Sequence, residues 1–243
     1  MQVAVYEHFL TQKQRLARAG TWGGLAVLFI GFAIAIFAEY IAQYVGQTGV
    51  LFVMYAAMIT GLIAFNNGRN AAMRWVSRPR EDEILASSLM RRGLDDRYWL
   101  LNYMKQTPAH HILVGPPGVY VLHVRAQDGD IVNQGKSWSR KMGLSSILRN
   151  LFEGSFGNPT AEAWRDVAAV RRHLASVLPA EEAQAVPVQP LVVFTNPRAK
   201  LTLREPEVPV VTPNNLYTYM RRQLKENRLN ADQLQLIGQS FGL

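Results

Sequence analysis

Residues 110–125 read HHILVGPPGVYVLHVR and have the clearest local pattern in the chain. Two runs rich in β-branched and aromatic residues flank the turn Gly115-Pro-Pro-Gly118, a pattern that predicts a β-hairpin. Apolar residues occupy both faces of the two runs, so we expect the hairpin to lie in the middle of a sheet. This part of the chain is therefore expected to fold around a central sheet.

The segments around the hairpin alternate between helical and extended patterns. Helices are expected over residues 80–93, 160–178 and from 214 onward. Further strands are expected at residues 98–103, 190–194, 201–203 and 208–211, and a polar loop over 135–158. Residues 81–243 are thus predicted to form an α/β domain, with a mixed central sheet flanked by helices.

Two uncharged apolar stretches precede this domain, at about residues 21–38 and 48–67. A helix that crosses a bilayer needs about 20 predominantly apolar residues, so each stretch is long enough. We predict a transmembrane hairpin over residues 21–68, between a cytoplasmic segment at 1–20 and a basic juxtamembrane linker at 69–80.

Basic residues flank the outer ends of the two apolar stretches, and none lies in the turn between them. They are Lys13, Arg15, Arg18, Arg69, Arg74, Arg78 and Arg80. Basic flanks stay in the cytoplasm, so we expect a multi-pass protein of the cell membrane with both termini cytoplasmic and the lipid bilayer as a partner. The alternative is a buried helical hairpin in a soluble protein. A cleaved signal peptide is disfavoured because a second apolar stretch follows the first directly.

Composition limits the chemistry that the chain can perform. The sequence contains no cysteine, which excludes disulfides, thiol nucleophiles and cysteine-ligated metals. The net charge of +8 is compatible with nucleic-acid binding, although the arginines beside the apolar stretches also suit anionic lipid. The Gly115–Gly118 turn lacks the lysine and the following helix of a phosphate-binding loop, so that motif is excluded.

The hairpin brings together polar residues that are distant in the sequence. If it closes symmetrically about Pro116 and Pro117, His110 stands opposite His123, and Arg125 shares their face. Polar side chains on central strands are costly to bury without partners. One explanation is a site for Zn²⁺ or another transition metal formed by Glu83, His110 and His123; the other is that both histidines are structural.

Residues 83–211 resemble the nuclease-related (NERD) domain, a member of the restriction-endonuclease-like PD-(D/E)xK superfamily. The helix glutamate of that family matches Glu83, and its hairpin motif matches residues 110–125 without a gap. Its helix start resembles Asn158-Pro159 followed by Glu162, which is a possible auxiliary acid. The resemblance implies a restriction-endonuclease-like fold and a nuclease site that uses Mg²⁺ or Mn²⁺.

The site positions depart from the family pattern. His110 stands in place of the family's aspartate, His123 in place of its second acid, and Arg125 in place of its lysine. Magnesium requires oxygen ligands, and arginine does not release its proton to help activate water. We therefore expect that metal-dependent catalysis has been lost and that no cofactor is bound.

Three functions follow from these expectations. The first is a membrane-anchored, catalytically inactive relative of nucleases that binds nucleic acid or acts as a scaffold. The second is an active Mg²⁺- or Mn²⁺-dependent nuclease with a rearranged site. The third is a membrane scaffold whose partners are other membrane or cytoplasmic proteins.

Overall fold

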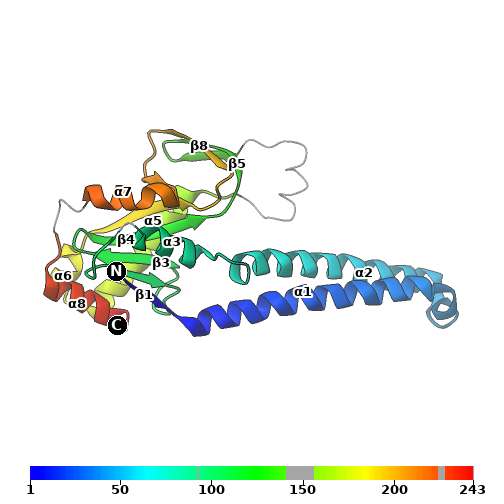
Figure 1. Ribbon diagram of the computed structural model, residues 1–243. Helices are drawn as coiled ribbons and strands as arrows, with labels where there is room; N and C mark the ends of the chain where they lie inside the picture. Colours follow the sequence, from blue (N-terminus) through cyan, green and yellow to red (C-terminus); the bar gives the residue numbers. More distant parts are fainter. Residues whose placement is uncertain (92, 141–155, 224–227, 243) are drawn as a thin grey trace. The chain divides into compact units, whose positions relative to one another are not determined.

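The computed structural model describes residues 1–91, 93–140, 156–223 and 228–242. It contains two compact units (Figure 1). One comprises Met1–Glu7 together with the described residues from Glu81 onward, and the other comprises His8–Arg80. The first unit has the predicted α/β architecture, with a mixed sheet flanked by helices.

The main sheet of the α/β unit has six strands in the order β1-β2-β3-β4-β7-β9. Their bounds are β1 Gln2–Val5, β2 Trp99–Asn102, β3 His111–Gly115, β4 Gly118–Arg125, β7 Val188–Phe194 and β9 Val210–Val211. β3 runs antiparallel to β2 and β4, whereas the pairs β1–β2, β4–β7 and β7–β9 are parallel. The β3–β4 hairpin thus lies inside the sheet, which confirms the prediction from its two apolar faces.

The hairpin has the predicted symmetric register, with Ile112 opposite Val121 and Gly115 opposite Gly118. Gly115 is required for packing, because a Cβ added there would lie 2.2 Å from Cε1 of Tyr98. Tyr98 is itself buried, and burial raises the pKa of its hydroxyl to about 12. The carbonyl of Pro116 accepts hydrogen bonds from the backbone N–H groups of Arg228 and Leu229, both at 2.9 Å. The Gly-Pro-Pro-Gly turn therefore has a structural role.

Helices cover both faces of the main sheet. Helices α5 (Pro159–Val177) and α8 (Ala231–Ser240) pack on the face that carries Ile112 and Val121. Helices α3 (Glu81–Met90) and α7 (Pro213–Gln223) pack on the opposite face, against Leu113 and Tyr120. The short helix α6 (Ala180–Ala185) follows α5. Because side chains alternate between the two faces of the sheet, successive residues of β3 and β4 pack against different helices.

A second sheet has three strands in the order β6-β5-β8. Their bounds are β5 Gly129–Gln134, β6 Ser137–Arg140 and β8 Ala199–Arg204. The polar loop predicted over residues 135–158 was wrong at its start, because β6 pairs with β5 across a tight turn at Gly135 (φ +56°). Residues 141–155 of the predicted loop lie outside the described residues, and residues 156–158 are neither helix nor strand, as predicted.

Strand β1 is a feature that the sequence analysis did not anticipate. It lies at the edge of the main sheet and pairs in parallel with β2, with Val5 beside Asn102. The backbone N–H of Gln2 donates to the carbonyl of Tyr98 at 2.8 Å, and that of Tyr6 donates to the carbonyl of Asn102 at 3.0 Å. Residues that precede the apolar helices therefore share a sheet with residues that follow them.

The second unit consists of two long helices, α1 (Glu7–Ile36) and α2 (Ala38–Trp75), which lie side by side (Figure 1). Both are long and apolar enough to cross a membrane, and only 11% of each apolar window is buried, unlike a core helix of a soluble protein. Non-helical backbone at Gly46 interrupts α2 in the predicted turn region. α2 continues to Trp75, so about half of the segment predicted as a linker is helical.

Small residues form the contact between the two helices. Ala17, Gly24 and Gly31 of α1 and Gly61 and Gly68 of α2 are buried at seven-residue spacing. A Cβ added at Gly24 would lie 2.2 Å from the backbone nitrogen of Phe65, and one added at Gly68 would lie 2.1 Å from that of Thr21. Close backbone approach at small residues is typical of helix pairs in membranes.

We expect Gly24→Ala to destabilise the helix pair by about 1–3 kcal/mol, because the added methyl group overlaps the α2 backbone. Gly23→Ala is the matched control, since Gly23 is exposed and a Cβ there meets nothing within 4 Å. Unfolding of the full chain by increasing sodium dodecyl sulfate in mixed micelles, followed by circular dichroism, measures both. Equal stability of the two variants would contradict the glycine contact.

Candidate functional site

The candidate site lies between β4 and α5. On β4, Val119 and Val121 face the core beneath α5, and the same alternation places His123 and Arg125 on this face. Pairing of β4 with β7 holds the two residues in place, with His123 beside Val192 and Arg125 beside Phe194. The strand therefore directs an imidazole and a guanidinium toward the first turns of α5.

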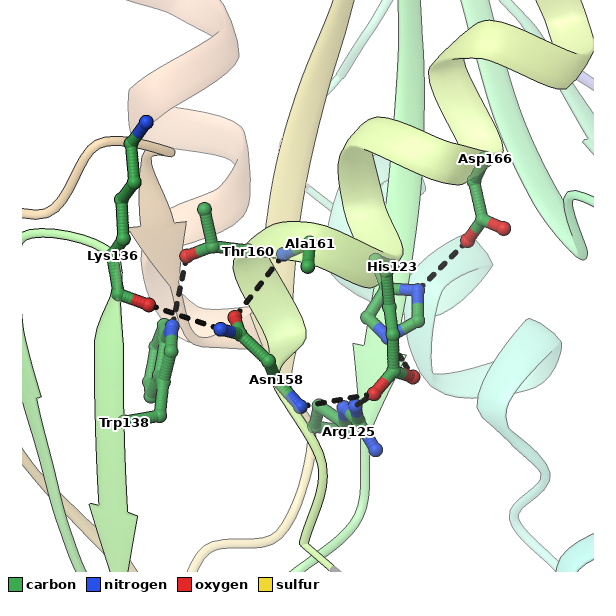
Figure 2. A network of polar contacts seen from close by, with 9 residues as sticks. His123, Arg125, Lys136, Trp138, Asn158, Thr160, Ala161 and Asp166 are labelled. Carbon is green, nitrogen blue, oxygen red and sulfur yellow. Dashed lines mark hydrogen bonds and ion pairs between the residues drawn. The ribbon is translucent and has the colours of Figure 1, made fainter.

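The start of α5 is organised by Asn158 (Figure 2). Its side-chain Oδ1 accepts from the N–H of Ala161 at 3.1 Å, its side-chain Nδ2 donates to the Lys136 carbonyl at 3.2 Å, and its backbone N–H donates to Oε1 of Glu162 at 3.1 Å. Pro159 then occupies the first position of the helix, where a missing N–H is tolerated. This capping arrangement fixes the Glu162 carboxylate above the sheet.

The polar contacts of the site join His123 and Arg125 of β4 to Glu162 and Asp166 of α5. Oδ2 of Asp166 lies 2.8 Å from Nδ1 of His123, and Oε2 of Glu162 lies 3.5 Å from its Nε2. Nη2 of Arg125 lies 2.7 Å from Oε1 of Glu162, although the guanidinium is not aligned for a hydrogen bond. Figure 2 shows Asp166 and Arg125 on opposite sides of His123.

The four side chains of this cluster, His123, Arg125, Glu162 and Asp166, are between 11% and 27% exposed. At this depth an isolated carboxylate is costly, and each has a cationic or imidazole partner. A neutral imidazole donates to only one carboxylate, and the 2.8 Å contact identifies Asp166 as the stronger acceptor.

Aromatic side chains border the cluster. Trp138 of β6 donates from Nε1 to Oγ1 of Thr160 at 2.8 Å and packs on Phe194, with ring centroids 5.8 Å apart. Phe156 lies under the Arg125 guanidinium, 5.9 Å from its central carbon. Gly157 passes so close that a Cβ there would lie 2.4 Å from Oε1 of Glu162, and its φ is +68°. Phe156 and Gly157 therefore pack closely against the cluster.

A second polar cluster lies on the other face of the sheet, beneath α3. His111 is 1% exposed; its Nδ1 lies 2.8 Å from Oδ1 of Asn102, and its Nε2 lies 3.6 Å from Oε2 of Glu81. Nearby, the Tyr103 hydroxyl donates to Oδ1 of Asp82 at 3.2 Å. This cluster is separate from the one under α5, because α3 and α5 cover opposite faces.

The structure brings only some of the predicted residues together. His123, Arg125 and Glu162 meet in the cluster under α5. Glu83 lies half-buried in the first turn of α3, on the other side of the sheet. His110 directly precedes β3, and its ring lies 5.7 Å from that of Tyr103 and 6.2 Å from that of His111.

Sequence reasoning missed Asp166, Glu81, Asn102 and His111. Asp166 had a detectable signal, because it follows Glu162 by four residues on a predicted helix and so shares its face. The other three carry no spacing signal, since their contacts join separate segments. Among the described residues, no group of three or more His, Cys, Asp or Glu side chains is placed to hold a metal ion.

The donor set does not fit the magnesium ion that the family resemblance implies. Mg²⁺ needs oxygen ligands in octahedral geometry. Both carboxylates of the α5 cluster already contact His123 or Arg125, and the β4 positions offer nitrogen in place of oxygen. The cluster is arranged as a set of ion pairs rather than as a cation site.

Comparisons with known proteins agree with the sequence resemblance. Residues 78–195 match the family model NERD, described as a nuclease-related domain. Neither the search of curated proteins nor the search of solved structures found a match. The matched region includes α3, the β3–β4 hairpin, α5 and β7, and so contains both polar clusters.

Proposed function

Since residues 78–195 form a nuclease-related (NERD) domain, we propose that this chain is a membrane-anchored nuclease relative that binds nucleic acid without cleaving it. The observation that carries the proposal is the set of polar contacts among His123, Arg125, Glu162 and Asp166, which includes the Arg125–Glu162 ion pair. The domain keeps the nuclease-like framework, while the site that would hold a catalytic metal is neutralised from within.

Loss of catalysis follows from the chemistry of these side chains. Metal-assisted hydrolysis needs a cation that polarises the phosphate and lowers the pKa of a bound water. Arg125 holds Glu162 in an ion pair, and a guanidinium stays protonated, so it does not serve as a base. His123 is held by Asp166 through the 2.8 Å contact at its Nδ1. The remaining capacity is binding, which the net charge of +8 supports.

The membrane part of the proposal rests on the helix pair and on β1. The outward-facing side chains of α1 and α2 include exposed Phe29, Phe32 and Phe52, which suit lipid contact. Residues before α1 and after α2 belong to one compact unit, so both ends of the helix pair would lie on the same side of a membrane. The basic flanks favour the cytoplasmic side, which would make the chain multi-pass with both termini cytoplasmic.

Cysteine labelling tests this topology, because the chain has no cysteine of its own. We expect Gln47→Cys, between the two apolar stretches, to react with a membrane-impermeant maleimide in intact cells. Glu181→Cys, exposed on α6, should react only after lysis. The reverse pattern would contradict the orientation, and recovery of the chain in the soluble fraction would contradict membrane insertion.

Binding and cleavage assays on the full chain in lipid nanodiscs test the domain's function. We expect binding of DNA or RNA that weakens steeply between about 50 and 200 mM salt, without cleavage in Mg²⁺ or Mn²⁺. Cleavage that is lost in Glu162→Gln would support an active nuclease with a rearranged site. Absence of binding at low salt would favour a scaffold for proteins. The full chain is needed because a fragment starting at Ser77 lacks β1 and exposes the edge of β2.

A further inference from the structure

The helix pair joins the α/β unit at two residues, which we call its roots. Tyr6 directly precedes α1, and Glu81 begins α3 after the end of α2. The backbone N–H of Tyr6 donates to the carbonyl of Asn102 at 3.0 Å. Oε2 of Glu81 lies 3.6 Å from Nε2 of His111. Tyr6 therefore contacts Asn102, and Glu81 contacts His111.

Asn102 and His111 connect the two roots. They are opposite one another on β2 and β3, and both are buried, at 0% and 1% exposure. Their side chains are joined by the 2.8 Å contact between Oδ1 of Asn102 and Nδ1 of His111. A continuous series of polar contacts thus runs from Tyr6 through Asn102 and His111 to Glu81.

The backbone beside this pair supports a specific role. Tyr103 follows Asn102 and adopts φ +61°, a conformation that is uncommon for a bulky residue. Its N–H donates to the His110 carbonyl at 2.6 Å, and its ring lies 5.1 Å from that of His111. Local strain persists only where its surroundings over-determine it, and here those surroundings are the polar pair and Asp82.

An apolar pair would fill the same volume without the cost of burying an amide and an imidazole. Buried polar pairs are best attested where they specify one arrangement of chain segments. At this position the segments to be specified are β1 and α3, which are far apart in the sequence and are both attached to the helix pair.

We propose that Asn102 and His111 form a clamp that couples the two roots, so that release of β1 loosens α3. Through this clamp, displacement of either α1 or α2 would change the contacts at both roots, Tyr6 and Glu81. It lies on the face opposite the His123 cluster and does not depend on nucleic-acid binding.

Two proline substitutions separate release of β1 from other effects. The N–H of Gln2 donates to Tyr98, directly before β2, and that of Tyr6 donates to Asn102 of β2. By alternation Ala4 also directs its N–H toward β2, whereas Val3 directs its N–H toward the open edge. Ala4→Pro therefore removes a donor from the pairing, and Val3→Pro is the matched control. Hydrogen–deuterium exchange of the full chain in lipid nanodiscs, read by mass spectrometry, reports on β1, α3, β4 and β7 separately.

We expect Ala4→Pro to raise exchange about tenfold in α3 from Leu85 to Met90, with β4 and β7 unchanged and Val3→Pro without effect. In a His111→Phe background, which keeps the ring volume, Ala4→Pro should add nothing at α3. Increased exchange in β1 with α3 unchanged would overturn the proposal. An equal increase in α3, β4 and β7 would also overturn it, because the effect would then be global.

Discussion

Replacing His123 by glutamate and Arg125 by lysine together is expected to create a divalent-metal site under α5. The double change removes the two side chains that contact Glu162 and Asp166, and adds a third carboxylate within the same cluster. Three carboxylates offer the oxygen ligands that Mg²⁺ and Mn²⁺ prefer. We expect affinity for Mn²⁺ to rise at least about tenfold, equivalent to about 1.4 kcal/mol, by isothermal titration calorimetry.

The same charge change made on α5, away from the cluster, is the control for this experiment. His173→Glu with Arg172→Lys alters the net charge equally but leaves the cluster intact. The two double variants should also differ in stability, because only the site variant should gain thermal stability when Mn²⁺ is added. Equal metal affinity in the two variants would contradict the match between β4 and the metal-binding positions of the family.

Catalytic turnover is a less direct test of the metal site under α5 than metal affinity is. Under the proposed function, residues that orient metal ligands are no longer constrained, and such outer partners typically contribute 10–100-fold to metal affinity or activity. A metal site without cleavage would therefore still support the interpretation. Mn²⁺-dependent cleavage by the unchanged chain would contradict it.

Replacing Gly115 by alanine is expected to destabilise the α/β unit by about 3 kcal/mol, which is near the upper end for overpacking a core. The added Cβ would lie 2.2 Å from Cε1 of Tyr98, whose side chain is buried. Gly115 has no positive φ, so the cost is steric rather than conformational. Urea titration of the full chain in micelles, read by pulse proteolysis of the α/β unit, measures the loss.

Two further variants identify the cause of that loss. Gly93→Ala changes a glycine at φ +82° with open space around it, so it should lose only about 1 kcal/mol through backbone conformation. Tyr98→Leu in the Gly115→Ala background should recover part of the stability by vacating the overlapped volume. If Gly115→Ala behaves like Gly93→Ala, the close approach of Tyr98 is not the reason for glycine in the turn.

The two halves of the motif at residues 110–125 have different roles. The Gly-Pro-Pro-Gly turn serves packing, because Tyr98 crosses Gly115 and Arg228 and Leu229 bind the Pro116 carbonyl. The chemistry belongs to the end of β4, where His123 and Arg125 meet α5. The turn and the charged end of β4 therefore have separate roles, although both lie in the region that matches the NERD family model.

Features that depend on local periodicity and on short turns could be predicted from the sequence. The register of the β3–β4 hairpin follows from the position of the two prolines, and the face shared by His123 and Arg125 follows from the two-residue period of a strand. The two long apolar helices follow from composition alone, and the family follows from the hairpin together with its flanking motifs.

Only the tertiary structure decided which charges meet. Asp166 is one helical turn beyond Glu162, but its contact with His123 depends on how α5 packs across β4 and β7. Glu83 and His123 were grouped because both match one motif, whereas α3 and α5 cover opposite faces of the sheet. Likewise, β1 is a four-residue strand whose pairing with β2 spans more than ninety residues of sequence. Short strands carry little local signal, and contacts between distant segments depend on packing that no single stretch of sequence encodes.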